Sequence, residues 1–142
     1  MQDRRVQSSG GSAPSNLPIA LTIVSGITAA LVLVQAMLAG RFLYINPDLV
    51  DLHEIVANVI FLTALAQVVL AYLAMSRKLA TRADLVVAAV LMVLVTAQIG
   101  LGYSGREPGE AAALHVANGV LVFGVAIVAL MLSRAVRVPR VT

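Results

Sequence analysis

The sequence predicts an all-α fold, an integral membrane four-helix bundle, from its composition and from the distribution of its apolar residues. Hydrophobic residues make up 60% of the 142 residues and charged residues only 12%. A soluble domain carries about twice that charged fraction. The apolar residues gather in four runs that contain no charged residue, and each run exceeds 20 residues. The runs are residues 17–40, 55–76, 85–105 and 111–133.

Each of the four runs is long enough to cross a bilayer as a helix. About 20 helical residues, rising ~1.5 Å each, span a hydrocarbon core of ~30 Å. Backbone polar groups find no water in lipid, so a spanning segment must be helical or belong to a closed barrel. Barrel strands alternate apolar and polar residues, and these runs do not. We therefore expect four transmembrane helices within residues 17–133.

The two ends of the chain are expected to lie outside the bundle as tails. Residues 1–16 are polar and rich in Ser and Gly, a composition typical of disordered segments. Residues 134–142 form a short second tail. The first apolar run is long for a signal peptide and is followed by a poor cleavage site, so it is interpreted as a retained helix.

The distribution of basic residues predicts the orientation in the membrane. Cytoplasmic loops carry an excess of Lys and Arg. Eight of the ten basic residues fall on one side of the four predicted spans, and these are Arg4, Arg5, Arg77, Lys78, Arg82, Arg134, Arg137 and Arg140. The other side has Arg41 and Arg106. Both termini are therefore expected in the cytoplasm of a multi-pass cell-membrane protein, and the positive charge needs no nucleic-acid partner.

Two prolines in the outer loops mark expected helix starts. Asn46 precedes Pro47, and Glu107 precedes Pro108. Proline suits the first helical position because its missing N–H would have no intrahelical partner there. We expect the second helix to begin near Pro47 and the fourth near Pro108.

The chain also matches itself at an offset of 62 residues, which predicts two parallel helix-pair repeats. Helices one and two would be related to helices three and four by a pseudo-two-fold axis along the membrane normal. Gln35 and Gln98 are 63 residues apart, so they nearly match but are displaced by one position from the offset. The matched pairs are Gly40 with Gly102, Asp48 with Glu110, Leu52 with Leu114, His53 with His115, Phe61 with Phe123, and Ala64 with Ala126.

The repeat pairs the only two histidines of the chain, His53 and His115. Each lies near the outer end of a helix, where ionisable side chains usually face the bundle interior. The faces that continue from the two histidines at four, seven and eleven residues are alike in size: small, aliphatic, then alanine. They consist of Ala57, Ile60 and Ala64 after His53, and of Gly119, Val122 and Ala126 after His115.

Two histidines on facing helices, at equal depth and beside small residues, indicate an axial ligand pair for a haem. Neutral imidazole is a good iron ligand, and bundle cores commonly hold cofactors. The haem propionates would point to the outer surface, where Arg41 and Arg106 are the available cations, and an arginine fork matches a carboxylate. The predicted cofactor is haem b, with His53 and His115 as metal ligands.

Other interpretations of these residues remain open. An interfacial histidine can simply direct its ring to the headgroups. A zinc site wants three or four ligands, which Glu54 and Glu110 could complete. The buried amides Gln35, Gln67 and Gln98 favour helix–helix hydrogen bonds; Asn118 could bond to a ring, a propionate or a backbone group. The absence of cysteine excludes disulfides. The sequence contains no nucleophile–base pair of the kind that would indicate an enzyme.

Two stretches resemble a known family. AQIGLGYSGREPGEAAALHVANGVLVFG and DLHEIVANVIFLTALAQ resemble small bacterial four-helix membrane proteins of uncharacterised function, and they look like one half of the haem A synthase family. In that family each four-helix half carries haem-ligating histidines on its second and fourth helices. The resemblance covers most of residues 17–133 and implies that His53 and His115 take those positions. This chain corresponds to only one of the family's two four-helix halves and has no acidic residue in mid-membrane. The resemblance therefore implies at most a haem-holding bundle.

The leading hypothesis is therefore a membrane b-type haem protein that transfers electrons or holds haem during assembly of a respiratory enzyme. A cofactor-free accessory subunit of a membrane complex is the second hypothesis, and a small oligomeric transporter is the third. The absence of a mid-membrane carboxylate weakens the transporter. Besides lipid, other membrane subunits or further copies of the chain are the partners to expect.

Overall fold

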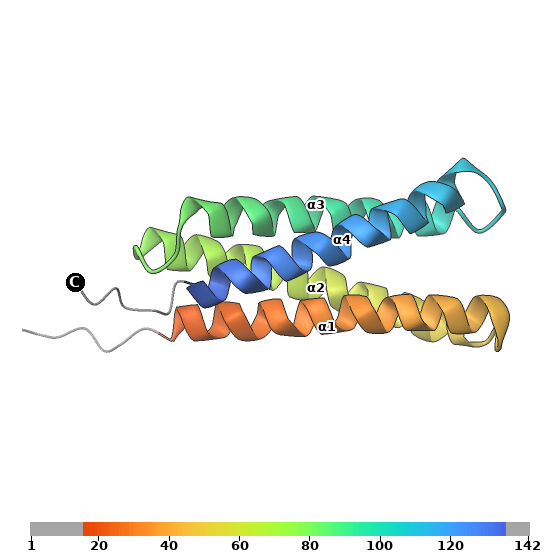
Figure 1. Ribbon diagram of the computed structural model, residues 1–142, viewed down its shortest axis with the longest axis horizontal. Helices are drawn as coiled ribbons and strands as arrows, with labels where there is room; N and C mark the ends of the chain where they lie inside the picture. Colours follow the sequence, from red (N-terminus) through yellow and green to blue (C-terminus); the bar gives the residue numbers. More distant parts are fainter. Residues whose placement is uncertain (1–15, 136–142) are drawn as a thin grey trace, which may run out of the picture.

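The computed structural model describes residues 16–135, which form four long helices with short connections (Figure 1). These are α1 (Leu17–Tyr44), α2 (Leu49–Ser76), α3 (Arg82–Ser104) and α4 (Glu110–Ala135). No strand occurs within this described part of the chain. Most of the two tails expected from the sequence lies outside it.

The predicted fold class is confirmed: the chain is an all-α four-helix bundle. All four helices are long and apolar enough to cross a membrane, as expected of a multi-pass membrane protein. Each helix packs against two neighbours in the order α1, α2, α3, α4 and back to α1. Helices α2 and α4, which carry the two histidines, therefore lie diagonally across the bundle.

The bundle has two distinct ends, which we name by their contents. The terminal end holds the start of α1, the α2–α3 connection and the end of α4, whereas the histidine end holds the α1–α2 and α3–α4 loops (Figure 1). Four described basic residues lie at or beside the terminal end: Arg77, Lys78, Arg82 and Arg134. Arg41 and Arg106 lie at the histidine end. The helices thus group the charges as the positive-inside argument requires.

The helix starts at the histidine end fall slightly later than predicted. Helix α2 begins at Leu49 and α4 at Glu110, each two residues after its proline. The backbone N–H groups of Leu49 and Val50 first bond three residues back, to Asn46 and Pro47, which makes a tighter turn before the helix. The residue at the N-cap position of α2 is Asp48, without a side-chain cap bond, so Asn46 does not cap the helix; its side-chain oxygen accepts a hydrogen bond from the Asp48 N–H at 3.1 Å within the preceding turn.

The short α2–α3 connection is fixed by two capping motifs. Lys78 has φ 58°, and its N–H and that of Leu79 donate to the carbonyls of Met75 and Ala74, as in a Schellman cap. Thr81 then starts α3 with a capping box, in which its side chain and backbone exchange hydrogen bonds with Asp84. These motifs end one helix and begin the next without further loop residues.

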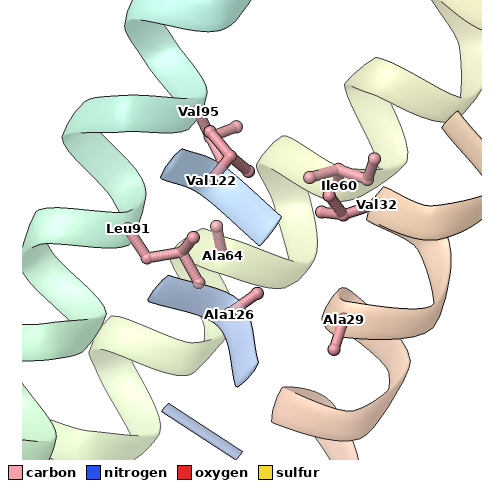
Figure 2. Packing of buried hydrophobic residues seen from close by; sticks show 8 residues of the cluster. All are labelled: Ala29, Val32, Ile60, Ala64, Leu91, Val95, Val122 and Ala126. Carbon is pink, nitrogen blue, oxygen red and sulfur yellow. The ribbon is translucent and has the colours of Figure 1, made fainter. Parts of the chain in front are cut away.

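The core at mid-bundle is built from the faces that follow the two histidines. Ile60 and Ala64 of α2 and Val122 and Ala126 of α4 are at most 4% exposed. Figure 2 shows them packed with Ala29, Val32, Leu91 and Val95 of the other two helices. The predicted small–aliphatic–alanine faces are therefore interior faces, as expected for the histidines that begin them.

Helix α4 crosses the bundle obliquely (Figure 1). At the terminal end it lies against α1, where the Thr22 hydroxyl donates to the Ser133 carbonyl at 3.0 Å. At the histidine end it lies against α3, where a Cβ on Gly105 would come within 2.9 Å of the Ala112 backbone. Glycine permits that approach, and α4 leans toward α3 and away from α1 as it nears the histidine end (Figure 1).

Candidate functional site

The two histidines meet inside the histidine end of the bundle. His53 lies four residues into α2 and His115 five residues into α4, a rise of about 6–8 Å from each helix start. Their ring centroids are 6.4 Å apart, with planes tilted by 55°. The expectation that the two rings lie at similar depth is confirmed, and their centroid distance falls within the ~4.5–7 Å range of neighbouring ring pairs.

The His115 ring is held on both of its nitrogens by Gln98 of α3. Nδ1 lies 3.0 Å from the Gln98 backbone oxygen and Nε2 lies 3.2 Å from the Gln98 side-chain nitrogen. A carbonyl oxygen can only accept, so the network assigns the proton to Nδ1. Nε2 then carries the lone pair. This arrangement is typical of metal-binding histidines, whose second nitrogen donates to a carbonyl.

Asn118 extends the network around His115. Its side-chain nitrogen donates to the Gln98 side-chain oxygen at 2.7 Å and to the Leu94 carbonyl at 2.9 Å. Of the partners considered for Asn118, the structure thus shows a neighbouring backbone group, together with Gln98. The network fixes the Gln98 amide, which in turn fixes the ring.

Two glycines make room for this network. A Cβ on Gly102 would lie 3.1 Å from the His115 ring, and a Cβ on Gly119 would lie 3.2 Å from the Gln98 side-chain nitrogen. Both distances are shorter than ordinary carbon contacts. Neither glycine was singled out for this role from the sequence, although the repeat had paired Gly102 with Gly40.

The His53 ring is held differently. Within the described residues its nitrogens make no hydrogen bond, and Nδ1 is buried. The ring packs edge-on against Phe42, with centroids 5.1 Å apart. Gln35 donates to the His53 backbone carbonyl at 2.8 Å rather than to the ring, and its side-chain oxygen is also buried without a partner. Two polar atoms at this site therefore lack the partner that buried groups normally have.

A cavity of about 390 Å³ adjoins both rings and is bounded by all four helices. Pockets for small ligands commonly measure ~300–1,000 Å³. Its polar lining consists of Gln35, His53, Gln98 and His115, and the remaining lining residues are apolar or glycine. The predicted neighbours Ala57 and Gly119 line it too, so the small residues do leave space beside the histidines.

Neither predicted arginine lines the cavity. Arg106 forms an ion pair with Glu54 at 2.8 Å and lies over the Tyr103 ring. Arg41 is exposed and lies six residues beyond Gln35, about 120° around α1 at 100° per residue and on the side away from the cavity. Their contact with propionates stays a prediction.

The spacing of the two rings fits one metal ion between them. Metal–nitrogen bonds of about 2.0–2.1 Å, with each centroid ~1.1 Å behind its nitrogen, place imidazole centroids roughly 6.3 Å apart. The observed separation is 6.4 Å. The lone pair on Nε2 of His115 faces the Gln98 side-chain nitrogen, and the His53 ring makes no hydrogen bond within the described residues. The donor set therefore suits haem iron.

A zinc-type site does not form in the described part of the chain. No group of three or more His, Cys, Asp or Glu side chains gathers there, and Glu54 is engaged by Arg106. The expected helix–helix bonding of the buried amides holds for Gln35 and Gln98. Gln67 is 2% exposed, yet its side-chain oxygen has no partner, and we have no physical explanation for it.

No family model matches the chain, and neither a curated protein nor a solved structure resembles it significantly. The class defined by the fold and the site is a four-helix membrane bundle with a paired-histidine cavity at one end.

Proposed function

We propose that this protein is a membrane b-type haem protein in which His53 and His115 are the two axial ligands. The observation that carries the proposal is the 6.4 Å separation of two imidazoles beside an apolar cavity. When bound, haem supplies one-electron redox chemistry or is itself the cargo held for a respiratory enzyme.

The residues around the rings would orient the ligands. The Gln98 backbone carbonyl accepts a hydrogen bond from the Nδ1–H of His115, which would leave Nε2 as the ligating nitrogen. For His53, the unpaired Nδ1 and the unpaired Gln35 side-chain oxygen are a potential donor and acceptor. The apolar lining excludes water from both rings. Neither Arg41 nor Arg106 lines the cavity, and Arg106 is paired with Glu54, so propionates at the histidine end would meet them only after these side chains reorient, and water could serve in their place.

The spectrum of protein purified from haem-replete cells tests the proposal. We expect coloured protein with a sharp low-spin spectrum on reduction, and poor binding of carbon monoxide, because two imidazoles fill both axial positions. Well-folded colourless protein would refute the haem proposal and favour the cofactor-free accessory subunit, in which the histidines only pack the bundle.

We also propose that the terminal end faces the cytoplasm of the cell membrane. Support comes from four basic residues at or near that end within the described chain against two at the histidine end. A reporter active only in the cytoplasm should work when fused after Thr142 or within residues 77–82, and should fail within residues 104–110. Activity at 104–110 would reverse the orientation.

A further inference from the structure

The helix-pair repeat creates two equivalent seams in the bundle, one between α1 and α4 and one between α2 and α3. At the histidine end these seams differ. Leu33 of α1 is 52% exposed, whereas its repeat counterpart on α3, Val95, is 2% exposed. Val116 of α4 is 68% exposed, whereas its counterpart Glu54 reaches Arg106 of the α3–α4 loop. The α2–α3 seam is closed where the α1–α4 seam is not.

The cavity lies along the α1–α4 seam. Its lining includes Leu33 and Ala36 of α1 and Val116 and Val120 of α4, all of which are exposed and apolar or small. The position on α3 that matches Ala36 is Gln98, which fills the space beside His115. The cavity therefore has an apolar side opening that faces the acyl chains of a bilayer.

At the terminal end the same two helices are in contact. Thr22 bonds to the Ser133 carbonyl, and a Cβ on Gly26 would lie 3.8 Å from the Leu130 side chain. Ala36 and Val120 are ten residues from Gly26 and Leu130, or about 15 Å nearer the histidine end at 1.5 Å per residue. The helices separate along that length because α4 leans toward α3 (Figure 1).

We propose that the cavity is loaded sideways from the lipid, through this seam, by haem already dissolved in the bilayer. The inference rests on the proposed haem function and adds the route. Haem is a flat and largely apolar molecule, so it partitions into lipid and meets an opening lined by apolar side chains. Entry from the aqueous surface would instead have to pass the loops at the histidine end.

A cross-link across the opening tests the route. The chain contains no cysteine, so the double variant Ala36→Cys/Val120→Cys can be joined by a short bifunctional thiol reagent. Transfer of haem from donor vesicles to reconstituted apoprotein is followed by the Soret band. The cross-linked protein should load more slowly by about tenfold or more, because association that awaits a rearrangement is slow. Cross-linking after loading should slow haem release.

Two matched controls separate the outcomes. Gly26→Cys/Leu130→Cys joins the same helices where they already touch and should load at the wild-type rate. Ala36→Trp should slow loading, whereas Ala117→Trp, on an exposed part of α4 that does not line the cavity, should not. Equal loading by open and cross-linked protein, with haem bound in both, would overturn the route alone. Absence of haem binding in every variant would overturn the proposed function and the route together.

Discussion

The two helix pairs place the same residue types at matching positions but hold their histidines in different ways. In the α3–α4 pair, Gln98 bonds both nitrogens of His115, and Asn118 fixes Gln98. In the α1–α2 pair, Gln35 reaches only the backbone of His53. The one-residue slip between the two glutamines in the repeat accompanies this difference. The ring of one histidine is fixed by hydrogen bonds at both nitrogens, whereas the ring of the other makes none within the described residues.

The two pairs should behave alike where their packing is alike. Ala64 and Ala126 match in the repeat and are at most 1% exposed. Ala64→Leu and Ala126→Leu should each lower the free energy of unfolding by about 1–3 kcal/mol, because added methylenes have no space. Unfolding in detergent, followed by circular dichroism, gives the values. Ala57→Leu is the control, since it projects into the cavity and should leave folding intact. If only one of the two alanine substitutions lowered the free energy of unfolding strongly, the two helix pairs would not be equivalent in packing.

Substitution of Gln35 and Gln98 should affect the stability of the two helix pairs to different extents. Gln98→Leu should lower the free energy of unfolding by about 1–2 kcal/mol, since it removes the two side-chain hydrogen bonds to Asn118 and to Nε2 of His115. The bonds from Asn118 to the Leu94 carbonyl and from His115 Nδ1 to the backbone of residue 98 would remain. Gln35→Leu should cost about 0.5–1 kcal/mol at most, because it loses one bond and removes an unpaired oxygen. The same unfolding measurement compares them. Equal costs, or a larger cost at Gln35, would contradict the preoriented network around His115.

Gly40 and Gly102, which match in the repeat, should show the smallest difference between the two helix pairs, and the effect should be confined to the His115 ring. Gly102→Ala should push the His115 ring away from its 3.0 Å bond, because the new methyl lies 3.1 Å from the ring. Gly40→Ala meets nothing within 4 Å and should be silent. The readout is the histidine ring signal of isotope-labelled protein, with stability changed by no more than about 1 kcal/mol. Similar ring shifts in both variants would argue against a tight site on α3–α4 alone.

The sequence predicts the helices well, because their lengths and their lack of charge are set by the bilayer. It predicts helix ends less well. The tight turn after Pro47 delays the start of α2 to Leu49, and the bent segment around Pro108 delays the start of α4 to Glu110. The capping box places the start of α3 at Arg82. The Thr81–Asp84 spacing of a capping box is visible in the sequence, but the charge-free run that begins at residue 85 does not include it.

The histidine pairing was predictable, because the repeat matches His53 with His115 and the faces below them are similar. The exposed apolar seam between α1 and α4 was not predictable from the sequence. Leu33 and Val95 are equivalent in the repeat, yet one is exposed and the other buried. That difference accompanies the lean of α4 toward α3 (Figure 1), which is a property of the packed bundle and not of any pattern within one helix.

Titration of purified apoprotein with haem, in the wild type and in His53→Ala and His115→Ala, tests the central claim most directly. The wild type should take up one haem per chain with a low-spin spectrum. Each variant should bind haem weakly or give a high-spin spectrum that now responds to carbon monoxide, because one axial position is open. Gln67→Leu, a substitution outside the cavity, should bind as the wild type does. Low-spin haem bound equally well by both histidine variants would contradict the account.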